Sequence, residues 1–169
     1  MRVTREDANQ IARLLREKCP SLRGVELFGS TLRNGYGHDI DVVLIVDEEV
    51  ARTWWRDSGE ELRVRMGTSL LPLRRFIKTV FPAVDELFIR ARKARRQARA
   101  SELLGIDLTK LGTEYKAGLI IDSFLLPENW RDESRADFHV LTRLAKVIEN
   151  DRMTRSFLMH VAKQAVRIA

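Results

Sequence analysis

Two aspartates stand at the head of the strongest apolar run in the chain. Asp39 and Asp41 are two residues apart, and residues 42–46 are all Val, Leu or Ile. Such a run predicts a buried β-strand, in which residues two apart share a face. Two carboxylates on one face at the edge of a strand can bind a divalent cation together. The pair therefore indicates a metal site at the start of this strand.

A glycine and a serine end another apolar segment shortly before these acids. Residues 25–28 predict a strand, and Gly29 and Ser30 follow it directly. Glycine lets the backbone approach a phosphate closely, and the neighbouring N–H groups and hydroxyl can bind it. We expect residues 30–33 to start a short helix whose N-terminus faces the phosphate. A phosphate-binding turn beside a pair of metal ligands points to phosphoryl chemistry.

These residues together resemble the nucleotidyltransferase superfamily of DNA polymerase beta type. Its signature is a Gly-Ser turn, a spacer, an Asp-X-Asp motif and a third acid on a later strand. The matching residues are Gly29, Ser30, Asp39 and Asp41. Arg33 stands three residues after the serine, where DNA polymerase X enzymes carry an arginine that contacts the triphosphate.

The expected third acid lies in a later apolar run, at residues 117–128. Residues 117–126 contain one acid, Asp122. A lone buried carboxylate is costly unless it is paired or bound to a metal. The run resembles the third-acid strand of the DNA polymerase X group, in which alternating apolar residues and then proline follow the aspartate. Asp122 is therefore our expected third carboxylate. Asp85 and Asp107 remain as alternatives, and residues 106–109 are expected to form a short strand.

Residues 82–104 carry several helix signals. Pro82 opens the segment, acids follow in its first turn, and Gly105 comes just after its end. In a helix, Asp85 would complement the helix dipole. Residues 90–99 hold six cations and no acid, and four of these cations share one helix face: Arg92, Arg95, Arg96 and Arg99. This face either binds a polyanion such as nucleic acid or is solvated, and the sequence favours neither.

Composition limits the class of protein. The net charge of +6 and the pI near 9.9 are compatible with a nucleic-acid partner. The sequence has no run of 18 apolar residues, and its first residues lack the apolar region of a secretion signal. We therefore expect a soluble, cytoplasmic protein without a membrane partner. The single Cys19 has no partner for a disulfide and is expected to be an inert thiol.

The segments together predict an α+β fold, and the resemblance implies a mixed sheet of the polymerase-beta palm type, flanked by helices. Residues 1–130 would form the catalytic domain, with the basic helix at about 82–104 as an insertion. Residues 131–169 would form a C-terminal helical extension of two amphipathic helices, and its His139 and His160 are expected to be structural. Trp54 and Trp55 are expected in a helix, one of them in the core.

The resemblance implies a metal-dependent nucleotidyltransferase. In that interpretation Asp39, Asp41 and Asp122 hold Mg²⁺ or Mn²⁺, and the Gly-Ser turn and the nearby arginine contact the nucleoside triphosphate. A nucleoside monophosphate passes to an acceptor hydroxyl and pyrophosphate is released. Nucleic acid is the leading acceptor because of the basic helix, with a small molecule or a protein as alternatives. A non-catalytic protein that binds nucleic acid or another partner on the same fold is the second hypothesis.

Overall fold

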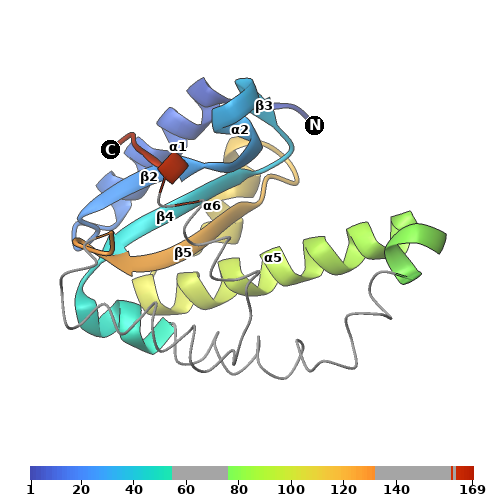
Figure 1. The fold of residues 1–169 in the computed structure, drawn as a ribbon. Coiled ribbons are helices and arrows are strands. Elements are labelled where there is room, and N and C mark those ends of the chain that lie inside the picture. The colour runs from blue at the N-terminus through green and yellow to red at the C-terminus, as the bar shows by residue number, and fades with distance from the viewer. Residues whose placement is uncertain (55–75, 132–160, 162) are drawn as a thin grey trace.

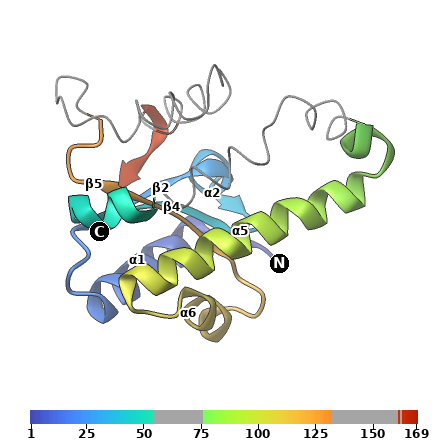
Figure 2. The ribbon, with the colours of Figure 1, turned by 90° about the horizontal axis from the view of Figure 1, so that it is seen from below.

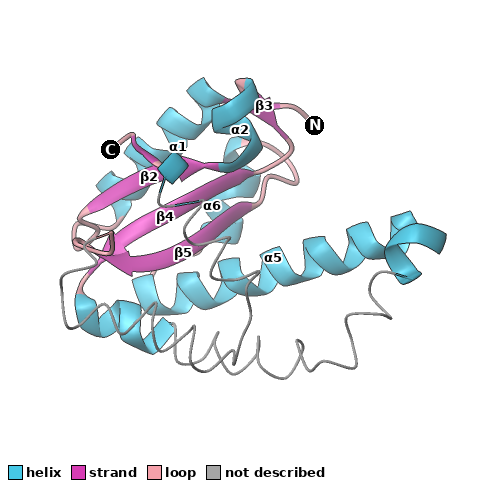
Figure 3. Cartoon of the chain, viewed as in Figure 1, coloured by secondary structure: helices cyan, strands magenta, loops and turns pink. Residues whose placement is uncertain are grey.

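The computed structural model describes residues 1–54, 76–131, 161 and 163–169. In this part the chain is a mixed α+β structure with a mixed sheet flanked by helices (Figure 1, Figure 3). The strands are β1 (Val3–Thr4), β2 (Gly24–Phe28), β3 (Tyr36–Gly37), β4 (Ile40–Val46), β5 (Ile121–Pro127) and β6 (Val166–Arg167). The helices with both ends described are α1 (Arg5–Lys18), α2 (Gly29–Asn34), α5 (Pro82–Leu104) and α6 (Leu108–Tyr115). Residues 48–54 are also helical.

The main sheet has the strand order β5-β4-β2-β6. Strand β4 pairs antiparallel with β2 and parallel with β5. It therefore lies between the strand that ends at the Gly-Ser turn and the strand that carries Asp122. Every residue of β2 and β4 is buried, including the charged Glu26 of β2 and Asp41 of β4. The register places Phe28 opposite Asp41, and Asp41 opposite Asp122. Two acids from distant segments therefore lie side by side.

Thr4 followed three residues later by Asp7 predicts a capping box at the start of a helix, and α1 begins there. Thr4 is its N-cap, its hydroxyl accepts from the N–H of Asp7, and the Asp7 carboxylate accepts from the N–H of Thr4 in return. Such a capping box satisfies N–H groups that the first turn leaves unpaired and contributes about 1 kcal/mol. One face of α1 carries the buried residues Ala8, Ile11, Ala12 and Leu15. These side chains belong to the same core as the apolar residues of β2 and β4.

The predicted basic helix is confirmed as α5, with Pro82 in its first turn and Gly105 as its left-handed C-cap. Its second half packs along β5, where Gln97 and Ala100 are buried. Its first half extends beyond the sheet in both ribbon views (Figure 1, Figure 2). Leu87, in that half, is 66% exposed. Residues 90–99 therefore stand where the helix passes from solvent onto the sheet.

Two secondary-structure predictions are wrong. Residues 106–109 do not form a strand, because Asp107 is the N-cap of α6 and its carboxylate accepts from the N–H of Lys110. The last helix was expected to run through Ile168, but Val166–Arg167 is strand β6, which pairs with β2. The neighbouring backbone of β2 offers these residues inter-strand hydrogen bonds that outweigh their helical apolar spacing. Residues 132–160, and with them His139 and His160, lie outside the described part.

Trp54 and Cys19 are core residues, and Trp54 agrees with the expectation that one of the two tryptophans lies in the core. Trp54 is almost fully buried and its ring meets Phe124 of β5 edge to face, with centroids 5.6 Å apart. Cys19 is buried, and its thiol contacts the hydroxyl of Ser21. Trp55 falls in the range 55–75, outside the described residues. Among the described helices, none is long and apolar enough to cross a bilayer.

Candidate active site

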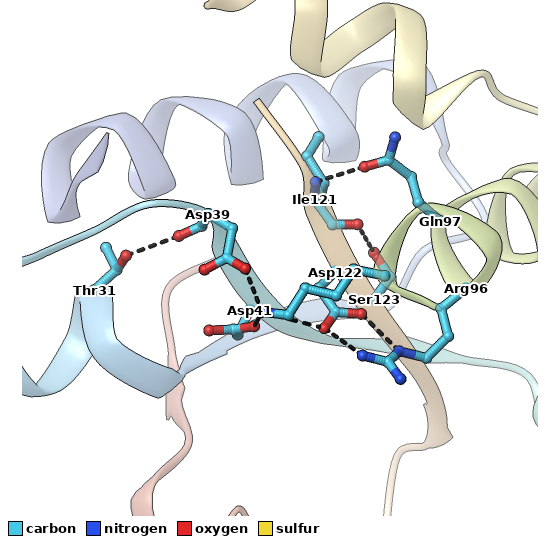
Figure 4. Close-up of polar contacts among 9 residues, drawn as sticks. Thr31, Asp39, Asp41, Arg96, Gln97, Ile121, Asp122 and Ser123 are labelled. Atoms are coloured by element: carbon cyan, nitrogen blue, oxygen red, sulfur yellow. Dashed lines mark hydrogen bonds and ion pairs between the residues drawn. The ribbon is translucent and has the colours of Figure 1, made fainter. Parts of the chain in front are cut away.

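Three carboxylates meet at one end of the β4–β5 pair. Asp41 lies on β4 and Asp122 on β5, directly opposite each other in the parallel register. Asp39 comes just before β4, where its backbone carbonyl accepts a 2.9 Å hydrogen bond from the hydroxyl of buried Thr31. Figure 4 shows the three acids grouped in front of the two strands. The structure thus brings together the three acids chosen from the sequence.

A lysine ammonium from α5 lies among these acids. Nζ of Lys93 donates to Oδ2 of Asp39, lies 3.2 Å from Oδ1 of Asp41, and is 3.8 Å from Oδ2 of Asp122. Its side chain is only 20% exposed. One cation therefore contacts all three carboxylates at once.

A second cation from α5 binds the most deeply buried of the acids. Nε and Nη2 of Arg96 donate to the two oxygens of Asp122 at 2.8 and 2.7 Å, a bidentate arrangement that Figure 4 shows. The Asp122 side chain is 3% exposed. Burial of a charge at this depth requires a paired and hydrogen-bonded partner, and the guanidinium fork supplies both.

Gln97, the next residue of α5, fixes the helix to β5. Its Oε1 accepts a 2.6 Å hydrogen bond from the N–H of Ile121, and its Nε2 donates to the hydroxyl of Thr109. The amide therefore satisfies a buried N–H of β5, which is an edge strand within the described part of the chain. This contact holds α5 at the position from which Lys93 and Arg96 reach the acids.

The predicted phosphate turn lies directly against Asp41. Gly29 has a positive φ of 78°, and a Cβ at this position would stand 2.1 Å from Oδ2 of Asp41. Glycine is therefore required here both for the backbone conformation and for the space. The hydroxyl of Ser30 points towards Gly37, where an added Cβ would be 2.6 Å from it. The turn and the first carboxylates form one packed unit, whereas Arg33 is exposed on α2.

The electrostatics of the cluster are dominated by burial. Burial raises the pKa of Asp41 from 3.8 to about 6; Lys93 opposes this rise, while Asp39 and Asp122 add to it. Burial alone would lower the pKa of Lys93, but Asp41, Asp122 and Asp39 together raise it above its ordinary value. Lys93 is therefore charged at neutral pH. Three carboxylates facing Lys93 and Arg96 leave the ionised cluster one negative charge in excess.

The cluster can be compared with what a divalent cation requires. Aspartate oxygens are the ligands that Mg²⁺ and Mn²⁺ prefer, so the types of donor fit. Their present arrangement does not fit, because Lys93 lies among the three acids and Arg96 occupies both oxygens of Asp122. Within the residues that the structure describes, no three His, Cys, Asp or Glu side chains are arranged to hold a metal ion.

The other predicted residues lie elsewhere or have other contacts. Asp107 caps α6, and Asp85 belongs to the first turns of α5, but its side chain is not among those described. Of the four arginines predicted to bind nucleic acid, Arg96 pairs with Asp122, and Arg99 pairs with Glu102 at 2.7 Å. Two of the four arginines therefore pair with acids that lie outside residues 90–99.

Sequence reasoning missed Lys93 and Gln97, and it gave Arg96 the wrong surroundings. A signal was present in the charges. A buried strand acid needs a cation, and residues 90–99 hold six cations without an acid of their own. The chain matches no protein-family model, no curated protein and no solved structure.

Proposed function

We propose that this chain is a metal-dependent nucleotidyltransferase, which transfers a nucleoside monophosphate from a nucleoside triphosphate to an acceptor hydroxyl. The observation that supports the proposal is the meeting of Asp41 and Asp122 in register on β4 and β5, against the turn at Gly29. The Gly-Ser turn and the Asp-X-Asp motif lie far from Asp122 in the sequence, yet they meet the third acid at the expected point. A surface pair of acids has no need for such burial or for a glycine beside it.

The proposal gives each residue a role in binding or positioning. Asp39, Asp41 and Asp122 would hold Mg²⁺ or Mn²⁺, which supplies positive charge to offset that of the triphosphate. Gly29 keeps the turn close to Asp41, and the hydroxyl and backbone N–H of Ser30 would bind a phosphate oxygen. Arg33, exposed one helical turn further on, would reach the pyrophosphate end of the nucleotide.

The burial of the acids is itself an argument for function. The side chain of Asp122 is only 3% exposed, and burial raises the pKa of Asp41 to about 6. A buried ion pair is seldom more stable than a well-packed apolar pair of the same size. Carboxylates with perturbed pKa values, gathered on neighbouring strands, are typical of sites whose residues serve chemistry at some expense of stability.

The test is a transfer assay with matched variants. The full chain is incubated with each labelled nucleoside triphosphate, with Mg²⁺ or Mn²⁺, and with RNA, DNA or a cell extract, and the labelled product is identified. Asp39→Asn should abolish labelling, because it removes a ligand beside the turn. Asp47→Asn is the control, since Asp47 is 55% exposed and pairs with Arg23 on the surface. Equal labelling by the parent and Asp39→Asn would refute the proposal.

One observation favours a second candidate, a non-catalytic binding protein on the same fold. Lys93 and Arg96 already neutralise most of the charge of the three acids. A protein that no longer uses its acids for catalysis would keep such internal pairs. Nucleotide binding without transfer to any acceptor would favour this candidate, whereas metal-dependent labelling would exclude it.

The basic helix supports a nucleic-acid acceptor less directly than its sequence suggests. Arg92 is half-buried and Arg95 is exposed, and both lie on the predicted basic face of α5. Arg96 points into the acidic cluster (Figure 4). Nucleic acid stays our leading acceptor, with a small molecule or a protein hydroxyl as alternatives, because the net charge of +6 still favours a polyanion.

A further inference from the structure

Lys93 holds the position that a metal ion bound to the three acids would need. Its ammonium contacts Asp39, lies 3.2 Å from a carboxylate oxygen of Asp41 and is 3.8 Å from one of Asp122. A divalent ion bound by these acids would need the same carboxylate oxygens as the ammonium of Lys93. The two cations cannot contact these oxygens at once, because both are positive and both require close approach.

We propose that Lys93 is an intramolecular competitor for the divalent-cation site, so that metal binds only when the ammonium leaves the three carboxylates. The proposal rests on the proposed function, since it concerns the same acids. It adds a regulatory contact: with the lysine in place the site is closed to metal, and with the lysine displaced it is open.

The position of Lys93 on α5 suits such an exchange. Three residues later Arg96 grips Asp122 with both nitrogens, and Gln97 ties the helix to the N–H of Ile121. These contacts anchor the second half of α5, so the helix need not detach for the site to open. Lys93 precedes this anchor by three residues along α5, and its side chain is a flexible chain of four methylenes.

Lys93 and Arg96 therefore differ in what they contribute to the cluster. Arg96 binds Asp122 through a rigid planar fork, which keeps this carboxylate charged and oriented in the buried strand. Lys93 is a point charge shared among three acids, none of which it engages in a bidentate way. A compact, shared ammonium is the cation that a small divalent ion replaces most directly.

The test measures metal binding to the full chain, without reference to catalysis. Calorimetric titration with Mn²⁺ compares the parent, Lys93→Met and Lys93→Arg. We expect Lys93→Met to bind Mn²⁺ about tenfold tighter than the parent, because a competing unit charge is gone. Lys93→Arg keeps that charge and should bind no tighter than the parent. Lys110→Met is the matched control: it removes the same charge from a lysine of α6 that is 70% exposed and pairs with Glu114.

A second measurement uses the unmodified protein and does not depend on a variant that folds. Displacement exposes the Lys93 amine, so acetylation of Lys93 by an amine-reactive reagent should accelerate severalfold when Mn²⁺ is added, with Lys110 as the internal reference. Far-ultraviolet circular dichroism of each variant confirms that it is folded.

The outcomes separate this inference from the function on which it rests. If the parent binds Mn²⁺ and Lys93→Met binds it equally, or if Lys110→Met gains as much, the competition is refuted and the metal site stands. If the parent binds Mn²⁺ and the rate of Lys93 acetylation does not change, the competition is likewise refuted and the metal site stands. If neither the parent nor folded Lys93→Met binds Mn²⁺, the inference fails together with the metal ligands of the proposed function.

Discussion

Two glycines in this chain allow the contact between the turn and Asp41 to be measured. Gly29 and Gly35 both have a φ of 78°, a conformation that L side chains rarely adopt. A Cβ at Gly29 would stand 2.1 Å from Oδ2 and 2.8 Å from Cγ of Asp41, whereas a Cβ at Gly35 would meet nothing within 4 Å. Alanine at the two positions therefore shares the backbone strain, but only Gly29→Ala collides with the carboxylate.

The size of the effect follows from this comparison. An alanine in the left-handed region costs about 1–2 kcal/mol, which is the whole expected loss for Gly35→Ala. In Gly29→Ala the Asp41 side chain must also leave its rotamer, because carbon and oxygen atoms cannot approach to 2.1 Å. That displacement adds about 1 kcal/mol or more. We expect Gly29→Ala to lose about 2–3 kcal/mol of unfolding free energy in total.

Urea unfolding of both variants measures the difference, and a double-mutant cycle assigns it to Asp41. In the Asp41→Ala background the colliding oxygen and Cγ are absent, so most of the extra loss at Gly29 should disappear while that at Gly35 stays. Nucleotidyl transfer should fall in Gly29→Ala and remain near the parental rate in Gly35→Ala. Equal losses of stability and activity in the two variants would show that the turn and Asp41 do not form one unit.

Four further variants test the site. Burial raises the pKa of Asp41 from 3.8 to about 6. Between these two values the folded, metal-free protein therefore keeps a proton on Asp41 that the unfolded chain releases. The free energy of unfolding should fall by up to about 3 kcal/mol as pH rises from 4 to 7. Asp41→Asn should lack this component in urea unfolding with chelator present. A parental pH dependence in this variant would contradict the assignment. Ser30→Ala and Arg33→Ala should each weaken nucleotide binding severalfold in direct titrations, and unchanged affinity in both would remove the phosphate role of the turn. Replacing Arg92 and Arg95 by Gln should reduce the dependence of nucleic-acid binding on salt, because fewer counterions are released. The same salt slope as the parent would argue for another acceptor.

Local signals in the sequence were sufficient for much of the fold. Thr4 and Asp7 mark the start of α1, Pro82 and Gly105 bound α5, and the continuous apolar run after Asp41 is a buried strand. Each of these signals acts within a few residues, so the sequence alone displays it. The mixed sheet flanked by helices follows from the same segments, while membership of the nucleotidyltransferase fold stays a prediction.

The errors arise where contacts distant in sequence decide the structure. Residues 106–109 have the composition of a short strand, but Asp107 can also cap a helix, and a cap is what the chain uses. Val166 joins β2 across more than a hundred residues, which no local periodicity reveals. Lys93 meets Asp41 over a separation of 52 residues, and Arg96 meets Asp122 over 26. Such pairs become visible only once the strands are in register.

The contacts of α5 also change how the predicted insertion is understood. Asp41 and Asp122 lie side by side on adjacent strands, and two buried carboxylates without cations would repel each other and lose solvation. Arg96 and Lys93 supply the compensating charge, and Gln97 satisfies the N–H of Ile121 beside them. The strand pair that carries the acids is therefore stable with its charges only when α5 is docked. It follows that α5 is a structural part of the site, and that any nucleic acid bound along residues 90–99 would contact the same helix that pairs with the acids.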